Sequence, residues 1–355
     1  MNPILSNNYF VHFEQEGYKA LNNFIKNSSP STLFVLVDEN THHHCLPTLL
    51  ENLDADCSIE IIEIKAGEEF KNLETCTGVW NALTELGADR KSLLINLGGG
   101  VITDLGGFVA SAYKRGITFI NIPTTLLSMV DASVGGKTGV DLGVLKNQIG
   151  LFSNPEMVLI DTSFLKTVPH REIKSGLAEI IKYGLTFDIK LWDEIKGFNK
   201  LNINLLNNII YRSIEIKNEV VIKDPNEQSL RKVLNFGHTL GHAIESYFLE
   251  SENKENLTHG EAIATGMVTA AFISNKLLEF PLDYVLAIKN VILSIYGKIP
   301  VLKKDYEAIY TLLIHDKKNV GGTINFVLLT DYEQFKLDCT VEKQLVFEAL
   351  DFYNN

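Results

Sequence analysis

The sequence predicts an α/β protein with two domains: an N-terminal Rossmann-like parallel-sheet domain at residues 1–168 and a C-terminal, mainly α-helical domain at residues 169–355. Three observations lead to this prediction. The length of 355 residues is more than one hydrophobic core usually serves. Short β-branched runs alternate with amphipathic stretches in the first half. Long segments with helical periodicity fill the second half.

Five short apolar runs in the first half have the length and composition of buried strands. Segments with helical apolar spacing follow the first three runs, so we expect repeated strand and helix units around a parallel sheet. The five predicted strands are residues 32–37, 59–64, 92–97, 117–122 and 157–160.

Beyond Pro169 the pattern changes to long amphipathic segments, and strands nearly vanish. The spacing predicts helices over residues 205–222, 231–248 and 260–279. One late apolar run at 323–329, after a pair of glycines, predicts a strand and is the main exception.

The composition argues against several classes of protein. The formal net charge of −12 disfavours nonspecific attraction to nucleic acid or anionic lipid. The sequence has no run of about 18 apolar residues and no signal-peptide pattern at its start. Its four cysteines show no C-x-x-C spacing, which indicates reduced thiols. We therefore expect a cytoplasmic protein that binds neither nucleic acid nor a membrane.

Three consecutive glycines, Gly98–Gly100, follow the predicted strand 92–97. As a strand-to-helix turn they would direct backbone N–H groups and the positive end of a helix at an anion such as a pyrophosphate. The usual G-x-G-x-x-G spacing requires a glycine where Thr103 stands, so a purely structural turn is an equal alternative. The region that follows favours the phosphate, because two glycines directly precede Lys137, as in loops that wrap an anion.

The second half contains one carboxylate and several histidines at helical spacing. The set comprises Glu179, His238, His242 and His259, with the first two histidines at i, i+4; Lys182 follows Glu179 at i+3. A single histidine of this kind is more often a core residue, but this mixture is typical of a catalytic zinc site with three protein ligands. Spacing leaves open which three of the four candidates bind the metal. No carboxylate motif accompanies the histidines at 42–44, and we expect them in an exposed loop or helix start.

A series of longer motifs runs through most of the chain, from about residue 38 to residue 318. The stretches are GEEFK (67–71), GGGVITDLGGFVA (98–110), RG (115–116), PTTLL (123–127), Asp131, GGKTGV (135–140), KNQIG (146–150), GLAEIIKYG (176–184), RKVLNFGHTLGHAIE (231–245), HGEAIATGM (259–267) and DKK (316–318). In these residues and in this order, the chain resembles the 3-dehydroquinate synthase family. It departs from the family at Asp141, where asparagine is usual, and at Ser229, where glycine is usual.

The resemblance implies ligands for a metal and for a nucleotide. It places Glu179, His238 and His259 on a divalent metal, zinc or alternatively cobalt, and moves His242 into the substrate pocket. It also implies a bound NAD, with Asp104 at a helix start near the cofactor. The implied NAD-binding residues are Asp38, Glu68, Lys71, Gly99, Gly100, Val101, Thr103, Asp104, Thr124, Thr125, Asp131, Lys137, Lys146, Phe164 and Thr167.

The implied substrate is a sugar acid phosphate, whose anionic ends need a basic pocket in an acidic protein. The residues placed there by the resemblance are Arg115, Lys137, Asn147, Lys182, Lys217, Arg231, Asn235, His242 and Lys317.

The implied activity is that of an NAD- and metal-dependent carbon–oxygen lyase of the shikimate pathway, which serves aromatic amino acid biosynthesis. It would convert 3-deoxy-D-arabino-heptulosonate 7-phosphate to 3-dehydroquinate and phosphate through transient oxidation, phosphate elimination, re-reduction and aldol closure. A homodimer is implied as well. The alternatives are another sugar phosphate cyclase and a metal-dependent, NAD-linked polyol dehydrogenase, which would release NADH. A binding module with a degenerate site should lack a metal ligand or base, and every expected one is present.

Overall fold

The computed structural model describes residues 1–143, 145–196, 203–314 and 324–355. The chain divides into two compact units, Met1–Ile173 with Ile203–Ile222 and Lys174–Asn202 with Lys223–Asn355. A single boundary near residue 168 does not describe this division, because residues 203–222 return to the first unit.

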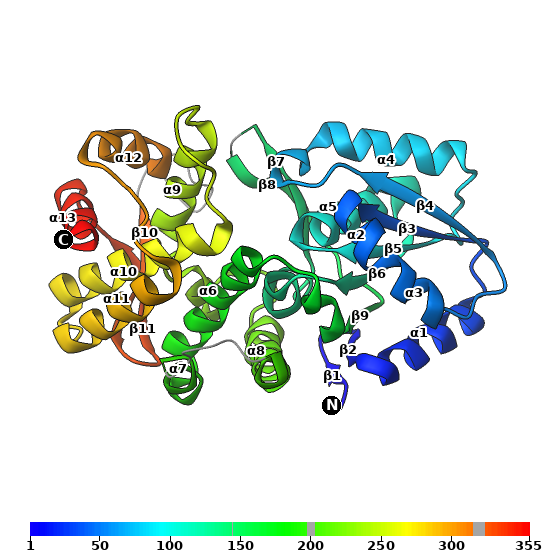
Figure 1. Cartoon of the computed structure of the whole chain (residues 1–355), viewed down its shortest axis with the longest axis horizontal. Helices are drawn as coiled ribbons and strands as arrows, with labels where there is room; N and C mark the ends of the chain where they lie inside the picture. Colours follow the sequence, from blue (N-terminus) through cyan, green and yellow to red (C-terminus); the bar gives the residue numbers. More distant parts are fainter. Residues whose placement is uncertain (144, 197–202, 315–323) are drawn as a thin grey trace. The chain divides into compact units, whose positions relative to one another are not determined.

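A seven-stranded sheet forms the centre of the first unit, and the α/β fold class is confirmed (Figure 1). The outermost pair, β1 and β2, is antiparallel, and the other neighbours are parallel. Side by side, the strands are β1 (Ile4–Leu5), β2 (Phe10–Phe13), β9 (Met157–Ile160), β6 (Thr118–Pro123), β5 (Leu93–Gly98), β3 (Thr32–Asp38) and β4 (Ser58–Ile64). All five predicted strands are present to within a residue or two.

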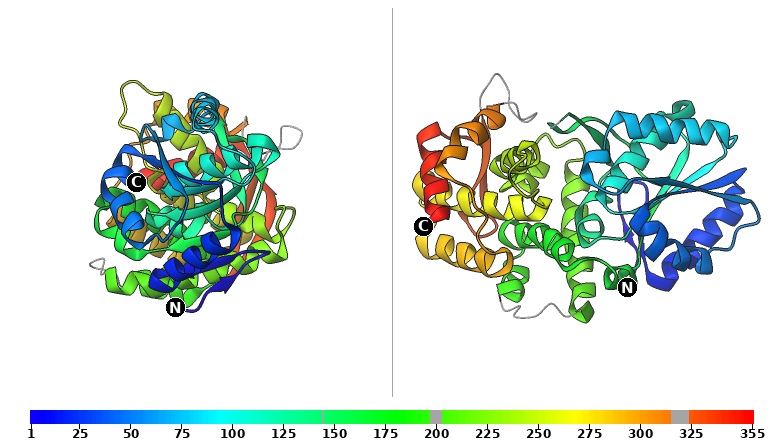
Figure 2. Two further views of the ribbon diagram at one scale, coloured as in Figure 1. Left: turned by 90° about the vertical axis from the view of Figure 1, so that its right-hand side faces the viewer. Right: turned by 45° about the horizontal axis from the view of Figure 1, so that its top comes forward.

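Helices cover both faces of this sheet (Figures 1 and 2). Leu36 of β3 packs in one core with Leu83 and Leu105, so the helices that carry these leucines cover that face. On the opposite face, Gly17 lies so close to β9 that an added Cβ would be 2.9 Å from Leu159 Cγ. The helical elements of this unit are α1 (Glu14–Ser28), α2 (Glu39–His44), α3 (Leu46–Asn52), η1 (Glu68–Phe70), α4 (Leu73–Glu85), α5 (Gly100–Ala112), η2 (Tyr113–Arg115), η3 (Ser128–Ala132), η4 (Thr162–Lys166) and α8 (Ile203–Lys223).

The GGKTGV segment, whose two leading glycines predicted an anion-wrapping loop, continues directly into a hairpin strand. β7 (Lys137–Leu142) pairs antiparallel with β8 (Leu145–Phe152), and Gly139 lies opposite Gly150. A Cβ at Gly139 would be 2.5 Å from the carbonyl oxygen of Ile149, so this glycine lets the two backbones approach. The preceding Gly135 donates its N–H to the Tyr9 hydroxyl at 3.0 Å. These glycines therefore serve the hairpin.

The second unit is mainly helical and contains one described hairpin. Its central helix, α10, is buried along most of its length and contacts α9, α11, α13 and β10. The elements are α6 (His170–Thr186), α7 (Ile189–Lys196), η5 (Leu230–Asn235), α9 (His238–Glu250), α10 (His259–Leu278), α11 (Leu282–Tyr296), η6 (Lys303–Asp305), α12 (Tyr306–Ile314), β10 (Asn325–Asp331), β11 (Gln334–Thr340) and α13 (Lys343–Asn354).

The predicted helix over 231–248 is wrong in one respect: it breaks at Gly237. This residue has φ 79°, a left-handed conformation that favours glycine, and α9 begins directly after it. The predicted strand at 323–329 corresponds to β10, although residue 323 lies outside the described residues. Among the described helices, none is long and apolar enough to cross a membrane.

Candidate nucleotide and metal sites

The glycine turn lies where the strand order of the first unit reverses. From β3 the chain moves outward to β4 and then returns to the other side of β3 to form β5, β6 and β9. Leu36 of β3 pairs with Asn96 of β5, two residues before Asp38 and Gly98. The carboxyl ends of these two strands thus flank a switch point, the usual place for a dinucleotide in an open parallel sheet.

Packing supports the structural role of the glycines in this turn, and binding of a pyrophosphate stays a prediction. A Cβ at Gly98 would be 2.5 Å from Ile102 Cβ, and one at Gly99 would be 3.2 Å from Thr125 Cγ2. Packing therefore requires small residues here. Gly99 is also the N-cap of α5, a helix of 13 residues, so a helix N-terminus with its positive potential lies at the switch point.

Lys71 connects two of the predicted cofactor and substrate residues. Its Nζ donates to Asp104 Oδ2 at 2.6 Å and to Asn147 Oδ1 at 2.7 Å. Burial lowers the pKa of Lys71, but the carboxylates of Asp104, Glu68 and Asp141 outweigh burial and raise this pKa to about 12. Burial raises the pKa of Asp104, and Lys71 opposes this shift. Asp104 is the fifth residue of α5, and its carboxylate binds a lysine of the chain itself.

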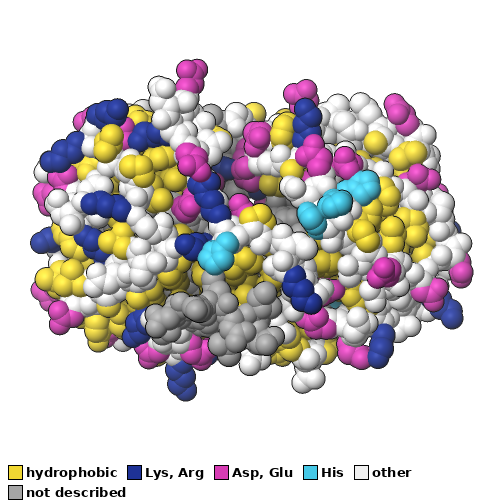
Figure 3. Space-filling model, in the orientation of Figure 1, with side chains coloured by type: hydrophobic (Ala, Val, Ile, Leu, Met, Phe, Trp, Pro, Cys, Tyr) yellow, Lys and Arg dark blue, Asp and Glu magenta, His cyan; other side chains and the backbone are white. Residues whose placement is uncertain are grey.

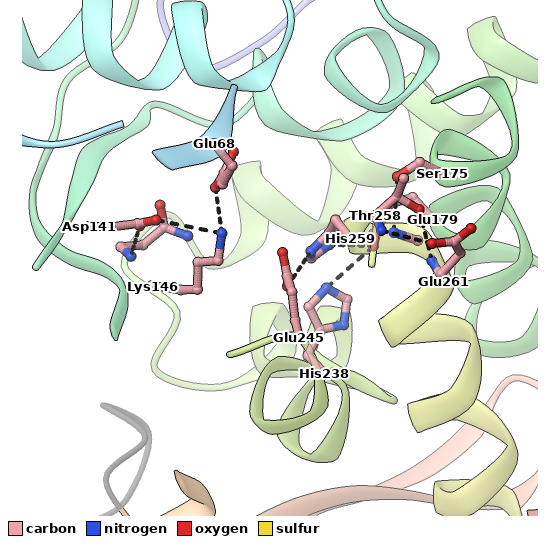
Figure 4. Close-up of polar contacts among 12 residues, drawn as sticks. Glu68, Asp141, Lys146, Ser175, Glu179, His238, Glu245, Thr258, His259 and Glu261 are labelled. Atoms are coloured by element: carbon pink, nitrogen blue, oxygen red, sulfur yellow. Dashed lines mark hydrogen bonds and ion pairs between the residues drawn. The ribbon is translucent and has the colours of Figure 1, made fainter. Parts of the chain in front are cut away.

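Lys146 belongs to the same group of charges, because both it and Lys71 act on Asp141; Figure 4 shows Lys146 with Glu68 and Asp141. Its Nζ is 2.8 Å from Glu68 Oε1 and 3.6 Å from Asp141 Oδ2. Asp141 Oδ1 accepts the backbone N–H of Asn147 at 2.6 Å, which helps to hold Asn147 at φ 50°. Asp141, one of the two residues by which the chain departs from its family pattern, is thus part of this cluster.

The remaining predicted residues of the first unit lie on several of its helices and strand ends. Lys217 on α8 donates to Asp131 Oδ1 at 2.7 Å. Thr124 is buried at the end of β6, and its N–H donates to the carbonyl of Gly98 at 3.0 Å. Phe164 is buried in η4, and Thr167 ends this element. Val101 and Thr103 lie in the first turn of α5, and Lys137 and Arg115 are exposed.

Three of the predicted metal ligands meet in the second unit (Figure 4). Glu179 Oε1 lies 3.3 Å from His238 Nε2 and 3.5 Å from His259 Nε2. The Glu179 side chain is fully buried, and its Oε1 has no hydrogen bond within the described residues. Burial raises the pKa of Glu179, but Lys182 and His238 outweigh burial and hold this pKa well below its usual range. An ionised oxygen thus faces two imidazole nitrogens.

The other nitrogen of each imidazole faces an acceptor. His238 Nδ1 lies 3.2 Å from the carbonyl oxygen of Phe236, and His259 Nδ1 lies 3.2 Å from Glu245 Oε2. Each acceptor favours the tautomer with the proton on Nδ1, which leaves the Nε2 lone pair toward Glu179 Oε1. In the metal-free protein a proton on Nε2 can occupy this place, and in the neutral tautomer a cation between the converging lone pairs stabilises the arrangement. The donor set therefore fits a divalent metal such as zinc.

Glycines and a capping box place these histidines. The left-handed Gly237 turns the chain so that His238 begins α9, and a Cβ at Gly237 would be 2.5 Å from Met267 Cγ of α10. His259 begins α10, whose start is fixed by the reciprocal Thr258 and Glu261 hydrogen bonds. The capping residues are drawn beside the metal candidates in Figure 4.

His242 remains a competing ligand in the described structure. His238, His242 and His259 each offer a nitrogen, and these atoms all lie within 4.8 Å of one another. The geometry thus brings together all four candidates that the spacing singled out, and it allows either three histidines or two histidines with Glu179. Lys182 contacts Glu179 Oε2, as its i+3 position predicted.

The other predicted residues of the second unit lie on η5 or outside the described residues. Arg231 is buried and donates to the carbonyl of Pro225 at 2.8 Å, and Asn235 donates to Glu227 Oε1 at 2.7 Å. Lys317 lies outside the described residues. In the first unit, the histidines at 42–44 are exposed at the end of α2, where His42 contacts Glu63.

Sequence reasoning missed Glu245. This residue lies on α9, three positions after His242 and seven after His238, so it shares their helix face. That spacing was available as a signal. Only the structure shows that Glu245 contacts His259.

A parallel sheet with a glycine turn at its switch point and a carboxylate–histidine cluster on helices together define a class of protein: metal-dependent enzymes that bind a dinucleotide. The family descriptions 3-dehydroquinate synthase N-terminal and 3-dehydroquinate synthase C-terminal match residues 61–175 and 176–319. The 3-dehydroquinate synthase of Parabacteroides distasonis is 42% identical over 94% of both chains. The chain belongs to the 3-dehydroquinate synthase family.

Two solved structures resemble the whole chain. One is 2-deoxy-scyllo-inosose synthase in complex with carbaglucose-6-phosphate, NAD+ and Co2+, with a TM-score of 0.86, 27% identity and 98% coverage of both chains. The other is the 2-epi-5-epi-valiolone synthase ValA of Streptomyces hygroscopicus with NAD+ and Zn2+, with a TM-score of 0.85 and 25% identity, covering 100% of this chain and 99% of that chain.

Proposed function

We propose that this protein is a 3-dehydroquinate synthase, which converts 3-deoxy-D-arabino-heptulosonate 7-phosphate to 3-dehydroquinate and phosphate in the shikimate pathway. The observation that carries the proposal is the position of Glu179 Oε1 beside the Nε2 atoms of His238 and His259, in a chain of this family. The enzyme is a phosphate-eliminating, NAD- and metal-dependent cyclase.

Glu179, His238 and His259 would hold the metal, which is zinc or cobalt in the two related structures. When bound, a divalent metal acts as a Lewis acid toward the hydroxyls of the substrate. The chain supplies the rest of this environment. Lys182 contacts the second oxygen of Glu179 and keeps the carboxylate ionised, and His242 lies one turn from His238, where it can hold or transfer a substrate proton.

The switch-point edge of the first unit would bind NAD, with Gly99, Gly100 and Val101 at the pyrophosphate. NAD supplies hydride acceptance and hydride return within one turnover. Asp38, Glu68, Lys71, Thr103, Asp104, Thr124, Thr125, Asp131, Lys137, Lys146, Phe164 and Thr167 complete the proposed set. The bonds of Lys71 and Lys146 to carboxylates support this part, since they hold both ammonium groups in place beside the turn.

The basic residues would bind the two anionic ends of the substrate. Arg115, Lys137, Lys182, Lys217, Arg231 and Lys317, with Asn147, Asn235 and His242, form the proposed set. Ammonium groups near a departing phosphate stabilise the charge that accumulates during elimination. Acidic and basic side chains are mixed over the face drawn in Figure 3, so the specific placement of these groups matters more than the net charge.

We also propose a cytoplasmic homodimer. The four free cysteines, two of them buried, support a reducing compartment. The dimer rests on the family resemblance alone.

The experiment that tests the function follows two products in one reaction. Purified protein is incubated with NAD, zinc and the heptulosonate phosphate, and inorganic phosphate, 3-dehydroquinate and NADH are measured together. Phosphate and the carbocycle should accumulate in equal amounts while NADH stays constant, because the hydride returns to the substrate. Sustained NADH formation in step with substrate loss would instead establish a polyol dehydrogenase, and a different carbocycle would establish another sugar phosphate cyclase.

A further inference from the structure

Glu245 is a buried carboxylate that the proposed function does not use. It lies on α9, two helical turns after His238, and its side chain is 9% exposed. Burying a carboxylate is costly unless the charge is paired or hydrogen-bonded. Its Oε2 lies 3.2 Å from Nδ1 of His259, on the neighbouring helix α10.

The close approach of the two helices brings Glu245 to His259. Gly241 lies one turn before Glu245 on α9 and faces α10. A Cβ at Gly241 would be 2.8 Å from Ile263 Cδ1 and 3.1 Å from the carbonyl oxygen of Ala262. A larger residue there would push the helices apart, so the glycine keeps the carboxylate within reach of the imidazole.

His259 thus lies between two carboxylates, with Nδ1 toward Glu245 and Nε2 toward Glu179. We propose that Glu245 is a positioning residue for the metal site: by accepting the Nδ1 proton it fixes the tautomer and ring orientation of His259, so that the Nε2 lone pair faces the ion. A charged acceptor also makes the imidazole a more basic ligand. This inference rests on the proposed ligand set.

His238 provides an internal comparison. Its Nδ1 faces the backbone carbonyl of Phe236, a neutral acceptor that no substitution removes. His259 depends instead on a side chain. Metal affinity should therefore respond to changes at residue 245, although Glu245 itself does not contact the ion.

The test measures metal binding without substrate. Metal-free protein, prepared with a chelator, is titrated with Zn2+ against a competing indicator, and Co2+ is added separately to record its visible spectrum. Glu245→Ala should weaken zinc binding by about 10- to 100-fold, the usual effect of losing a partner of a metal-bound histidine, and shift the cobalt spectrum. Glu245→Gln keeps an acceptor for Nδ1 without the charge, so it should recover much of this loss.

Asp305→Asn is the matched control. Asp305 is a buried carboxylate of the same unit, bound to Tyr247 and Lys254, so its neutralisation should lower stability without changing zinc affinity. If Glu245→Ala does not fold, Glu245→Asp carries the test, because its shorter side chain withdraws the carboxylate from His259 Nδ1. Wild-type affinity and an unchanged cobalt spectrum in the folded Glu245→Ala or Glu245→Asp variant would overturn the inference.

His259→Ala separates this inference from the proposed function. If His259→Ala loses zinc and the Glu245 variants do not, only the role of Glu245 fails. If His259→Ala itself keeps zinc at wild-type affinity, the proposed ligand set fails and the role of Glu245 fails with it.

Discussion

The charged cluster beside the glycine turn and the histidine cluster of the second unit differ in how their charges are balanced. In the first, Lys71 binds Asp104, and Lys146 binds Glu68, so opposite charges of the chain neutralise one another. In the second, Glu179 Oε1 faces imidazole nitrogens and has no hydrogen bond within the described residues. The charges of the first cluster are paired within the chain, whereas the donor atoms of the second are arranged to suit a divalent cation. Variants at the first should therefore lower stability in addition to any effect on NAD binding, whereas variants at the second should affect metal binding or catalysis.

The largest effect is expected at Lys182, which contacts the metal-site carboxylate. Lys182→Ala removes a positive group placed to stabilise charge at the reacting substrate, so kcat should fall by about 100- to 1,000-fold. With zinc in excess over its dissociation constant, zinc content should stay at the wild-type level, because all three proposed ligands remain. Steady-state kinetics and metal analysis of the same preparation measure both. A near-normal kcat would show that Lys182 does not face the reacting groups.

Lys71→Met tests the charged cluster of the first unit through its effect on stability. It leaves Asp104 buried without its partner, so the free energy of unfolding should fall by about 3 to 5 kcal/mol. Denaturant titration measures this loss. The control is Lys19→Met, which breaks an ion pair whose side chains are 69% and 73% exposed and should cost less than about 1 kcal/mol. Equal losses in the two variants would contradict the account.

The same lysine predicts a pH dependence. Its pKa is about 12 in the folded protein, above the value of about 10.4 expected for an unfolded lysine. A raised pKa stabilises the fold at every pH below the unfolded value, and this contribution disappears as pH rises toward 12. As the pH rises from about 10.4 to about 12, the free energy of unfolding of the wild type should therefore decline more steeply than that of Lys71→Met. Parallel slopes in denaturant titrations across this range would count against the buried pair.

A moderate effect is expected at Gly260, next to His259. An added Cβ would be 2.2 Å from the carbonyl oxygen of Ser175, so Gly260→Ala should push α10 from α6 and lower stability by about 1 to 3 kcal/mol. Zinc affinity should fall with it, because His259 moves. The control, Gly78→Ala in α4, has nothing within 4 Å of the new Cβ and should be neutral or slightly stabilising. Thermal unfolding compares the two.

The smallest effect is expected at the exposed histidines. His42 contacts Glu63, but the two side chains are 48% and 44% exposed. His42→Gln should change the free energy of unfolding by less than about 0.5 kcal/mol and leave zinc content unchanged. A loss of bound zinc in this variant would indicate a metal site in the first unit and contradict the proposed ligands of the second unit.

The sequence predicted the fold of the first unit well because its strands are buried. Runs such as 32–37 and 92–97 are almost continuously apolar, and this pattern needs no knowledge of their neighbours. The strand β2 was missed because its four residues include a polar His12 and form too short a run. The β7–β8 hairpin was missed because its strands contain Gly139 and Gly150 in place of apolar residues, and these glycines serve the contact between the two strands.

The metal site shows a sharper limit of sequence reasoning. The i, i+4 spacing of His238 and His242 was visible, and the structure does bring both rings together, with centroids 5.2 Å apart. Glu179 and His259 come from other helices, and their approach depends on the tight packing of α6, α9 and α10 at glycines. The contact between Glu245 and His259 depends on the same packing. Spacing along one helix could not predict it.

The central claim is that two histidines and Glu179 hold the metal while the third histidine does not. Metal analysis of purified His238→Ala, His242→Ala and His259→Ala, each loaded with zinc and then desalted, tests it most directly. We predict that the His238 and His259 variants lose zinc, since two remaining ligands hold it too weakly, and that the His242 variant keeps a full equivalent. Full zinc in the His259 variant together with loss in the His242 variant would contradict the account and make the i, i+4 histidine pair the ligands.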